Sequence, residues 1–166
     1  PLWEATCIQM KGCEHTGPGY FERFLDRESN EEESPLTPSF FEFSFGMERG
    51  MSDDPASVEE AVELTGAGGS EPLRIRGRID RIDISPDGFF LIYDYKSGTH
   101  PKSRDIEAGK ALQLPLYLLA FESVSGKRGV AAGYYKIRKD VESRMLLCDG
   151  TGKDLIVSRT RISPDF

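Results

Sequence analysis

The sequence predicts an α/β fold, because segments with helix and strand patterns follow one another in the order helix, strands, helix, strand. The clearest strand is Phe89–Lys96, an apolar run that follows the turn signal Pro86–Gly88. Leu73–Ser85 can fold back on this run through the turn as a hairpin. A helix with enough apolar surface to be well buried is expected over Asp105–Val124. The chain is long enough to bury one proper core, so we expect a single domain over residues 1–166.

The patterns before the hairpin are shorter. We expect helices over Pro1–Met10 and Tyr20–Leu25, and an exposed acidic loop over Glu28–Pro38. Ser39–Met47 alternates phenylalanine with glutamate and serine, which is the pattern of a half-buried strand. Its phenylalanines have the chemistry to stack on nucleic-acid bases, but packing in the core explains them better.

Two further regions complete the predicted organisation. Residues 48–72 are rich in glycine, serine and acidic residues, so we expect a flexible insertion between two strands, with a short helix over Ser57–Leu64. After the long helix, Val130–Ile137 predicts a strand that joins the sheet. Val141–Leu147 predicts an edge strand and Leu155–Ile162 a last strand.

The first strand of the hairpin changes phase along its length. Its isoleucines up to Ile79 share one face, whereas those from Ile82 onward lie on the other. The phase therefore slips near Asp80–Arg81, as it does at a β-bulge or a strong twist, and bulges often lie beside active sites. Folded back, the hairpin brings Asp80 close to Asp94 on the second strand.

Asp94 and Lys96 point the same way from the end of that second strand, because side chains of a strand alternate between its faces. Such charges cost free energy to desolvate unless they have partners or a function. One interpretation is a structural ion pair at a strand end. The other adds Asp80 and gives two carboxylates and a lysine at one point, which suits a divalent metal such as Mg²⁺ that prefers oxygen ligands and keeps several waters.

The net charge of −7 argues against a simple nucleic-acid binder, which normally carries a basic footprint. The total hides an asymmetry, because Pro1–Leu73 carries a net charge of −12 and Arg74–Arg138 carries +5. Attraction to phosphates is local, so the basic segment can still form a binding face. A solvated basic patch is the alternative interpretation.

Three motifs resemble those of the RecB-like branch of the PD-(D/E)XK nuclease superfamily. They are Gly77–Asp83 (Gly-Arg-Ile-Asp-Arg-Ile-Asp), Asp94–Gly98 (Asp-Tyr-Lys-Ser-Gly) and Gln113–Tyr117 (Gln-Leu-Pro-Leu-Tyr). The closest likeness is to the nuclease domain of AddB-type helicase–nuclease subunits, over roughly Leu73–Ala120. A lone Asp-X-Lys is a weak signal, but three motifs in this order are specific. The resemblance implies a three-layer restriction-endonuclease-like core, with a mixed central sheet flanked by helices.

The resemblance also implies roles for the motif residues. Asp80 and Asp94, with the backbone carbonyl of Tyr95, would bind Mg²⁺ or Mn²⁺, which polarises the scissile phosphate and lowers the pKa of a bound water. Lys96 would position that water or offset the charge that develops on the phosphate. The residues expected to act in catalysis are Asp80, Asp94, Lys96, Gln113 and Tyr117.

Gln113 and Tyr117 lie four residues apart on the predicted helix and so share a face. Taken alone, they are an ordinary pair on a helix surface. With the motifs upstream, we expect them to hold the substrate phosphate or to brace the metal-site residues. Pro115 lies between them and is expected to kink the helix, since it removes a backbone donor.

Other charged residues near the motifs are expected to play supporting parts. Asp83 repeats the acid of Asp80 three residues on and suits a hairpin or supporting position better than direct metal binding. Basic residues along the same segment are candidates for contacts with a DNA strand: Arg78, Arg81, Lys102, Arg104 and Lys110.

The function implied by the resemblance is metal-dependent hydrolysis of DNA, as the exonuclease domain of a helicase–nuclease in DNA repair and recombination. The expected partners are DNA and a helicase subunit or domain. One alternative is a catalytically incomplete domain that binds DNA or a helicase partner without cutting, and another is a scaffold domain whose charges form an ion-pair network. No apolar run approaches membrane-spanning length, so we expect a cytoplasmic protein with no membrane partner. The chain begins with proline, which suggests a fragment of a larger protein.

The cysteines and histidines add little to this site. Cys7, Cys13 and Cys148 are odd in number and irregularly spaced, so they predict neither a disulfide framework nor a closed zinc site. Many AddB-like nucleases carry an iron–sulfur cluster, with one cysteine before the core and three grouped after it. No such group of cysteines follows the core in this sequence, so we expect no iron–sulfur cluster within this chain. RecB-like nucleases also use a histidine or glutamate on an upstream helix, and neither His15 nor His100 matches that position.

Overall fold

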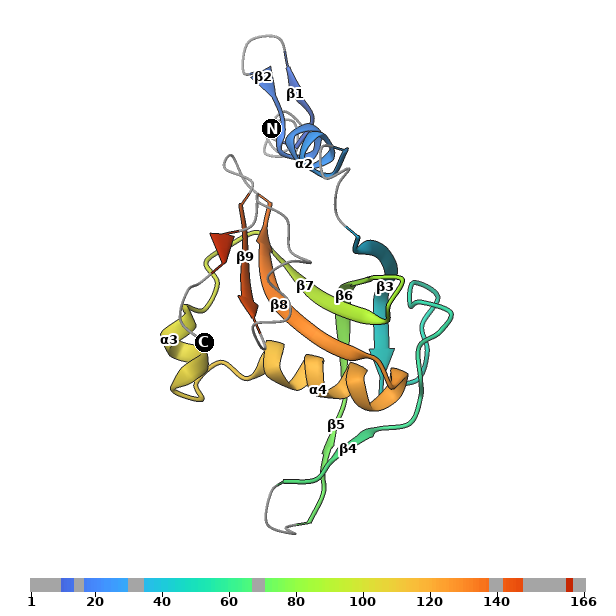
Figure 1. The fold of residues 1–166 in the computed structure, drawn as a ribbon. Coiled ribbons are helices and arrows are strands. Elements are labelled where there is room, and N and C mark those ends of the chain that lie inside the picture. Colours follow the sequence, from blue (N-terminus) through green and yellow to red (C-terminus); the bar gives the residue numbers. More distant parts are fainter. Residues whose placement is uncertain are drawn as a thin grey trace.

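The computed structural model describes residues 10–13, 17–29, 35–66, 71–137, 142–147 and 161–162. A six-stranded sheet forms the centre of this part of the chain, in the strand order β10-β9-β8-β7-β6-β3 (Figure 1). In chain order its strands are β3 (Thr37–Phe45), β6 (Gly77–Ile84), β7 (Phe89–Lys96), β8 (Arg128–Lys136), β9 (Glu142–Leu147) and β10 (Arg161–Ile162). The pairs β7–β8 and β9–β10 are parallel and the other pairs are antiparallel, so the predicted mixed sheet is confirmed.

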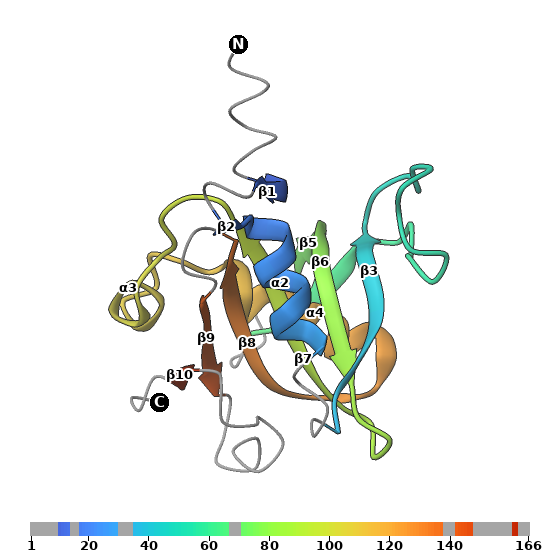
Figure 2. The same cartoon turned by 90° about the horizontal axis from the view of Figure 1, so that it is seen from above.

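Helices cover both faces of this sheet. Figure 2 shows α2 (Tyr20–Ser29) on one side and α4 (Gln113–Ser125) on the other, which gives the three layers that the sequence predicts. The core on the α4 side includes Phe121 of the helix, and the smaller core on the α2 side is packed by Phe24. The two helices therefore seal opposite faces of one sheet.

Strand β7 shows why its sequence is an almost continuous apolar run. Phe90 and Ile92 pack into the core on the α4 side, while Leu91 and Tyr93 pack into the core on the α2 side. Because successive side chains of a strand point to opposite faces, a strand covered on both faces must be apolar at every position. Asp94 is buried at the end of this run, where the alternation directs it towards the α4 side.

The segment between β3 and β6 forms a second, two-stranded sheet of β4 (Val62–Leu64) and β5 (Leu73–Ile75). This hairpin extends away from the central sheet below α4 in Figure 1. The helix predicted over Ser57–Leu64 is wrong, because Val58 forms a β-bridge with Phe45 and Val62 pairs with Ile75. β-Branched residues favour this extended pairing. The flexibility expected for residues 48–72 stays a prediction.

The single helix predicted over Asp105–Val124 is also wrong. The chain instead forms a short helix, α3 (Ser103–Glu107), and then α4, with a turn over residues 108–112 between them. Gly109 lies in this turn with φ of +67°, a conformation that glycine adopts without steric cost and that ends a helix. Pro115 is then in the first turn of α4, where its missing N–H has no helical partner to lose.

The remaining predicted elements are confirmed in part. The helix predicted over Tyr20–Leu25 extends further, to Ser29. The strand predicted over Val141–Leu147 is not an edge strand, because β9 pairs with β8 on one side and β10 on the other. The last residues of the strand predicted over Leu155–Ile162 form β10, and residues 155–160 lie outside the described part. The helix expected over Pro1–Met10 lies outside it except for its last residue.

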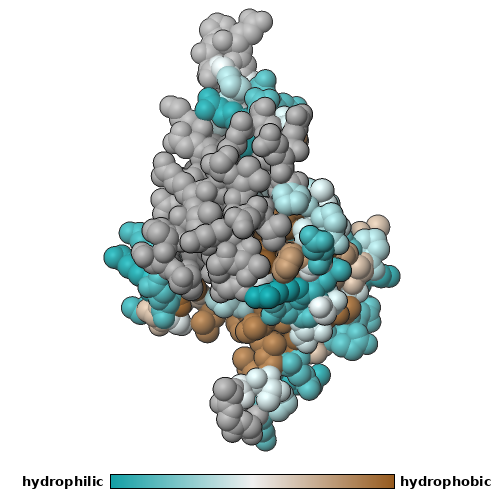
Figure 3. All heavy atoms as spheres, viewed as in Figure 1, coloured by the Kyte–Doolittle hydropathy of each residue, from teal (hydrophilic) through white to brown (hydrophobic). Residues whose placement is uncertain are grey.

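The outer surface of α4 keeps apolar side chains. Figure 3 shows apolar groups at the surface around this helix, and Leu112, Leu119 and Val124 are among the exposed large apolar residues. Among the helices of the described residues, none is long and apolar enough to span a bilayer.

Candidate active site

The site lies where strands β6 and β7 stop pairing. Their ladder runs from the Ile84–Phe90 pair to the Arg81–Tyr93 pair, and Asp80 comes directly after its end. Ile79 and Ile82 both belong to the core on the α4 side, although a regular strand would place residues three apart on opposite faces. The phase slip predicted near Asp80–Arg81 is therefore confirmed. Asp80 lies at the point where the alternation of side chains between the two faces is broken.

Beyond the end of the β6–β7 ladder, the Asp80 side chain hydrogen-bonds to the backbone of β7. Its Oδ2 accepts a hydrogen bond from the backbone N–H of Tyr95 at 2.7 Å. Burial raises the pKa of Asp80, and the charges of Asp94 and Glu42 raise it further against the opposing effect of the Tyr95 N–H. Asp80 is thus held beside Asp94 in an electrostatic environment that favours a cation.

Asp94 is the point at which all three sequence motifs meet. Lys96 Nζ lies 2.5 Å from Asp94 Oδ2, and Gln113 donates from Nε2 to Asp94 Oδ1 at 2.7 Å. Gln113 Nε2 also lies 3.3 Å from the Tyr117 hydroxyl, to which it donates. The structure therefore brings together Asp80, Asp94, Lys96, Gln113 and Tyr117, as the sequence predicts, at the junction of β6, β7 and α4.

The donor set suits a hard divalent cation. The Asp94 side chain is only 5% exposed, and among the described residues its Oδ2 has the ion pair with Lys96 at 2.5 Å and no other partner. A carboxylate oxygen has two lone pairs, so Oδ2 can bind a further ligand besides Lys96. Within the described residues no three His, Cys, Asp or Glu side chains are grouped to hold a metal. Mg²⁺ is nevertheless often bound by one or two carboxylates and several waters, which Asp80 and Asp94 can satisfy.

Glu42 is a neighbour of this site that the sequence did not reveal. In the β3–β6 ladder, Phe41 pairs with Arg81 and Phe43 with Ile79, which leaves Glu42 opposite Asp80. Its φ of +53° is the one positive value of a non-glycine residue in the described ranges. The phenylalanine doublet before Glu42 interrupts the alternation of β3 and is the sequence signal that could have revealed this irregular position.

Two of the residues predicted to contact DNA, Arg78 and Arg81, form ion pairs within the protein. Arg78 NH2 lies 2.8 Å from Oδ1 of the buried Asp53, and Arg78 NH1 lies 3.8 Å from Glu42 Oε2. The Gly50 N–H, the Ser44 hydroxyl and the Arg78 charge lower the pKa of Asp53 against the effect of its burial. Arg78 therefore links the loop that contains Asp53 to β6, beside Glu42.

Arg81 is buried on the opposite face of the sheet, with only 3% of its surface exposed. Its Nε and NH2 donate to the two carboxylate oxygens of Asp83 at 2.6 and 2.7 Å, and its NH1 donates to Glu28 of α2. The prediction that Arg81 contacts DNA is wrong, because the phase slip turns this residue inward. Asp83 occupies a supporting position in the hairpin, away from Asp80 and Asp94.

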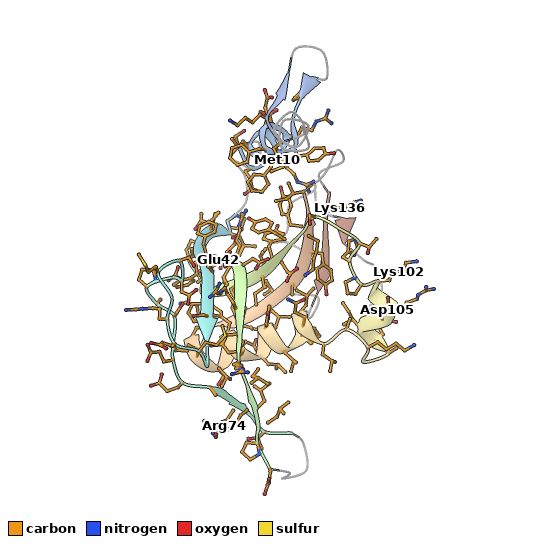
Figure 4. The ribbon with its side chains drawn as sticks, turned by 180° about the vertical axis from the view of Figure 1, so that it is seen from behind. Met10, Glu42, Arg74, Lys102, Asp105 and Lys136 are labelled. Atoms are coloured by element: carbon orange, nitrogen blue, oxygen red, sulfur yellow. The ribbon has the colours of Figure 1, made fainter. Side chains whose placement is uncertain are left out.

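The other basic candidates surround α3. Lys102, Arg104 and Lys110 are exposed there, and Figure 4 shows Lys102 and Asp105 on the opposite side of the molecule from Glu42. The Lys102 backbone N–H donates to Asp105 at the start of α3. Contacts between these residues and DNA stay predictions. Cys7, His15 and Cys148 lie outside the described residues.

Tyr134 of β8 is a second residue that sequence reasoning missed. It pairs in register with Asp94 across the parallel β7–β8 ladder, so both side chains point to the same face. Lys96 Nζ lies 5.6 Å from the centre of its ring, and the ring of His100 stacks on it at a centroid distance of 5.4 Å. Burial and the Asp94 charge raise the pKa of Tyr134 to about 12, which keeps its hydroxyl protonated at neutral pH. The sequence predicts the strand, but only the register places Tyr134 beside Asp94.

Comparison with known proteins adds one match. The family model of the PD-(D/E)XK nuclease superfamily matches residues 8–157, which is most of the chain and includes all three motifs. No curated protein matches the sequence.

Proposed function

Because the chain belongs to the PD-(D/E)XK nuclease superfamily, we propose that it hydrolyses phosphodiester bonds of DNA with a divalent metal ion. The observation that carries this proposal is the convergence on Asp94. Lys96 and Gln113 contact its two oxygens separately, and Asp80 is held nearby by the Tyr95 N–H. An ion pair that served only to stabilise the strand end would not need the second carboxylate or the glutamine.

Each residue then has a distinct part. Asp80 and Asp94, with the carbonyl of Tyr95, would hold Mg²⁺ or Mn²⁺, which when bound supplies Lewis-acid polarisation of the phosphate and a more acidic water. The Lys96 ammonium offsets the negative charge that grows on the phosphate oxygens during attack. Gln113 fixes the orientation of Asp94, and Tyr117 in turn holds Gln113, so the carboxylate does not need to reorganise.

The motif sequences support a finer assignment. Their likeness to AddB-type subunits leads us to assign the domain to the exonuclease part of a cytoplasmic helicase–nuclease in DNA repair and recombination. A helicase subunit or domain would then be its partner. This assignment rests on the resemblance of the motifs between Leu73 and Ala120.

One observation favours a second candidate function. Within the described part of the chain, no three metal-binding side chains are grouped, and the Lys96 ammonium already neutralises Asp94. A domain that lacks one metal ligand could bind DNA or a helicase partner without cutting. Binding without cleavage is the property that separates this candidate from a nuclease.

The deciding experiment is a cleavage assay of the purified chain on end-labelled single- and double-stranded DNA, with Mg²⁺, Mn²⁺ or EDTA. We expect cleavage with a metal and none with EDTA, and a loss of about 1,000-fold in Asp94→Asn, the size seen when one stabilising group is removed from an active site. Asp87→Asn is the matched control, because this exposed carboxylate lies at the other end of β7, about 20 Å away. Metal-independent binding with no cleavage by the unaltered chain would establish the second candidate instead.

A further inference from the structure

Tyr134 has a buried hydroxyl without a partner in the described residues. The residue is 3% exposed, and no described group gives or receives a hydrogen bond at its hydroxyl. A buried polar atom without a partner destabilises a protein, and most such atoms are paired. Phenylalanine would fill the same space without this cost. The hydroxyl therefore calls for an explanation outside the packing of the core.

The position of the hydroxyl indicates what it serves. Tyr134 and Asp94 are register partners on adjacent parallel strands, and the Asp94 charge acts on the tyrosine. The Lys96 ammonium of the site lies over the same ring. The unpartnered donor thus lies among the groups that surround the candidate metal site.

The ring is held in place from more than one side. His100 stacks on it with an interplanar angle of 19°, and His100 is itself oriented by a 2.8 Å contact between its Nδ1 and the Pro101 carbonyl. Packing in the core on the α4 side holds the rest of the tyrosine. A donor fixed in this way loses little entropy when it binds a ligand.

We propose that the Tyr134 hydroxyl donates a hydrogen bond to an oxygen of the phosphodiester bound beside Asp94 and Lys96. This inference rests on the proposed nuclease function and adds a substrate-contacting residue from β8 to the residues of the three motifs. A phosphate oxygen is a charged acceptor, and hydrogen bonds to charged acceptors are stronger than those between neutral groups. In a water-poor site, such a donor stabilises charge that grows on the phosphate.

The test compares Tyr134→Phe with Tyr135→Phe, the same change at the next residue, whose side chain packs on the opposite face. We expect Tyr134→Phe to lower the cleavage rate at saturating DNA by about 10- to 100-fold. We also expect its melting temperature to be equal to or above that of the unaltered chain, since an unsatisfied buried group is removed. Tyr135→Phe should cleave at close to the original rate.

Several outcomes would overturn the inference. Equal cleavage by Tyr134→Phe and the unaltered chain would show that the hydroxyl does not touch the reacting phosphate. A lower melting temperature for Tyr134→Phe with cleavage retained would show that the hydroxyl has a structural partner. If the unaltered chain shows no metal-dependent cleavage of end-labelled DNA, the proposed function fails first and the inference fails with it. The two failures are therefore distinguished by the unaltered chain alone.

Discussion

The two faces of the central sheet both bury charged side chains, but they satisfy these charges differently. On the α2 face, Arg81 donates to both oxygens of Asp83 and also to Glu28. On the α4 face, Asp94 Oδ2 is held by the Lys96 ion pair alone, and the Tyr134 hydroxyl has no hydrogen-bond partner among the described residues. Both faces belong to the same sheet, so the difference does not come from the fold alone.

A structural charge and a functional charge in this sheet differ in how their partners hold them. Burial does not distinguish them, because Arg81 and Asp94 are each about 3% exposed. What distinguishes them is the form of the pairing: Arg81 donates hydrogen bonds to both oxygens of Asp83, whereas Asp94 Oδ2 has only the ion pair with Lys96. A hydrogen-bonded pair such as Arg81–Asp83 stabilises the packing of β6 against α2, whereas the Tyr134 hydroxyl beside Asp94 remains available to a ligand.

The largest effect on stability should come from breaking the hydrogen-bonded Arg81–Asp83 pair. Arg81→Met leaves the buried Asp83 and the partly buried Glu28 without their cation, and we expect the free energy of unfolding to fall by about 3 kcal/mol. Urea denaturation measures this change. The matched control is Arg74→Met on the β4–β5 hairpin, whose exposed pair with Glu63 at 3.5 Å should contribute less than about 1 kcal/mol.

The same variant tests whether the two faces are independent. If the α2 face is purely structural, the Arg81→Met protein that remains folded should cleave DNA at close to the original rate per molecule. A loss of cleavage as large as that of Asp94→Asn, in protein shown to be folded by circular dichroism, would contradict the division between the two faces.

A substitution on the α4 face, at Asp80, should stabilise the folded protein instead of destabilising it. Burial and two neighbouring carboxylates raise the pKa of Asp80, so its ionised form is less stable in the folded chain than in the unfolded chain. We therefore expect Asp80→Asn to raise the melting temperature at neutral pH in the presence of EDTA, while it abolishes metal-dependent cleavage. The rise should shrink as the pH falls towards 3.8, the ordinary pKa of aspartate, because the carboxyl of the unaltered chain is then protonated in the folded state.

Thermal unfolding monitored by circular dichroism at several pH values makes this comparison. A melting temperature for Asp80→Asn well below that of the unaltered chain at neutral pH would show that Asp80 is a structural residue, as Arg81 is. A stabilised but inactive variant would instead show the exchange of stability for function that active sites often make.

The sequence could predict the local pattern on both faces but not the partners that close one of them. The β6–β7 hairpin, the phase slip and the mixed sheet follow from alternation, turn residues and motif order. The burial of Arg81 does not follow from the sequence. An arginine among other charged residues is expected to be exposed, and only the position of α2 in the fold shows that it is covered. Tyr134 is forty residues beyond Asp94, and only the parallel register of β7 and β8 joins them. Long-range pairing of this kind leaves no short-range mark in a single sequence.

A third charged cluster extends the comparison to the loop beside β3 and β6. Asp53 Oδ2 accepts from the Gly50 N–H at 2.9 Å and from the Ser44 hydroxyl at 3.0 Å, and Asp53 Oδ1 forms an ion pair with Arg78 at 2.8 Å. These contacts lower the pKa of Asp53, so its ionised form stabilises the fold. The Asp53 side chain is buried, but its ion-pair partner Arg78 is 41% exposed, so we expect a smaller effect than for Arg81–Asp83.

The contribution of Asp53 to stability should depend on pH. The stabilisation from a carboxyl with a lowered pKa is fully present above its unfolded value of 3.8 and is lost as the pH falls through its folded value. Asp53→Asn should therefore unfold at a lower urea concentration than the unaltered chain at pH 7, and the difference should narrow below about pH 4. Asp87→Asn, which removes the same charge from an exposed turn, should show little difference at either pH. A difference in stability that stays constant down to pH 3 would mean that Asp53 acts through its shape and neutral hydrogen bonds. Its charge would then not contribute to stability, in contrast to the charges of Arg81 and Asp83.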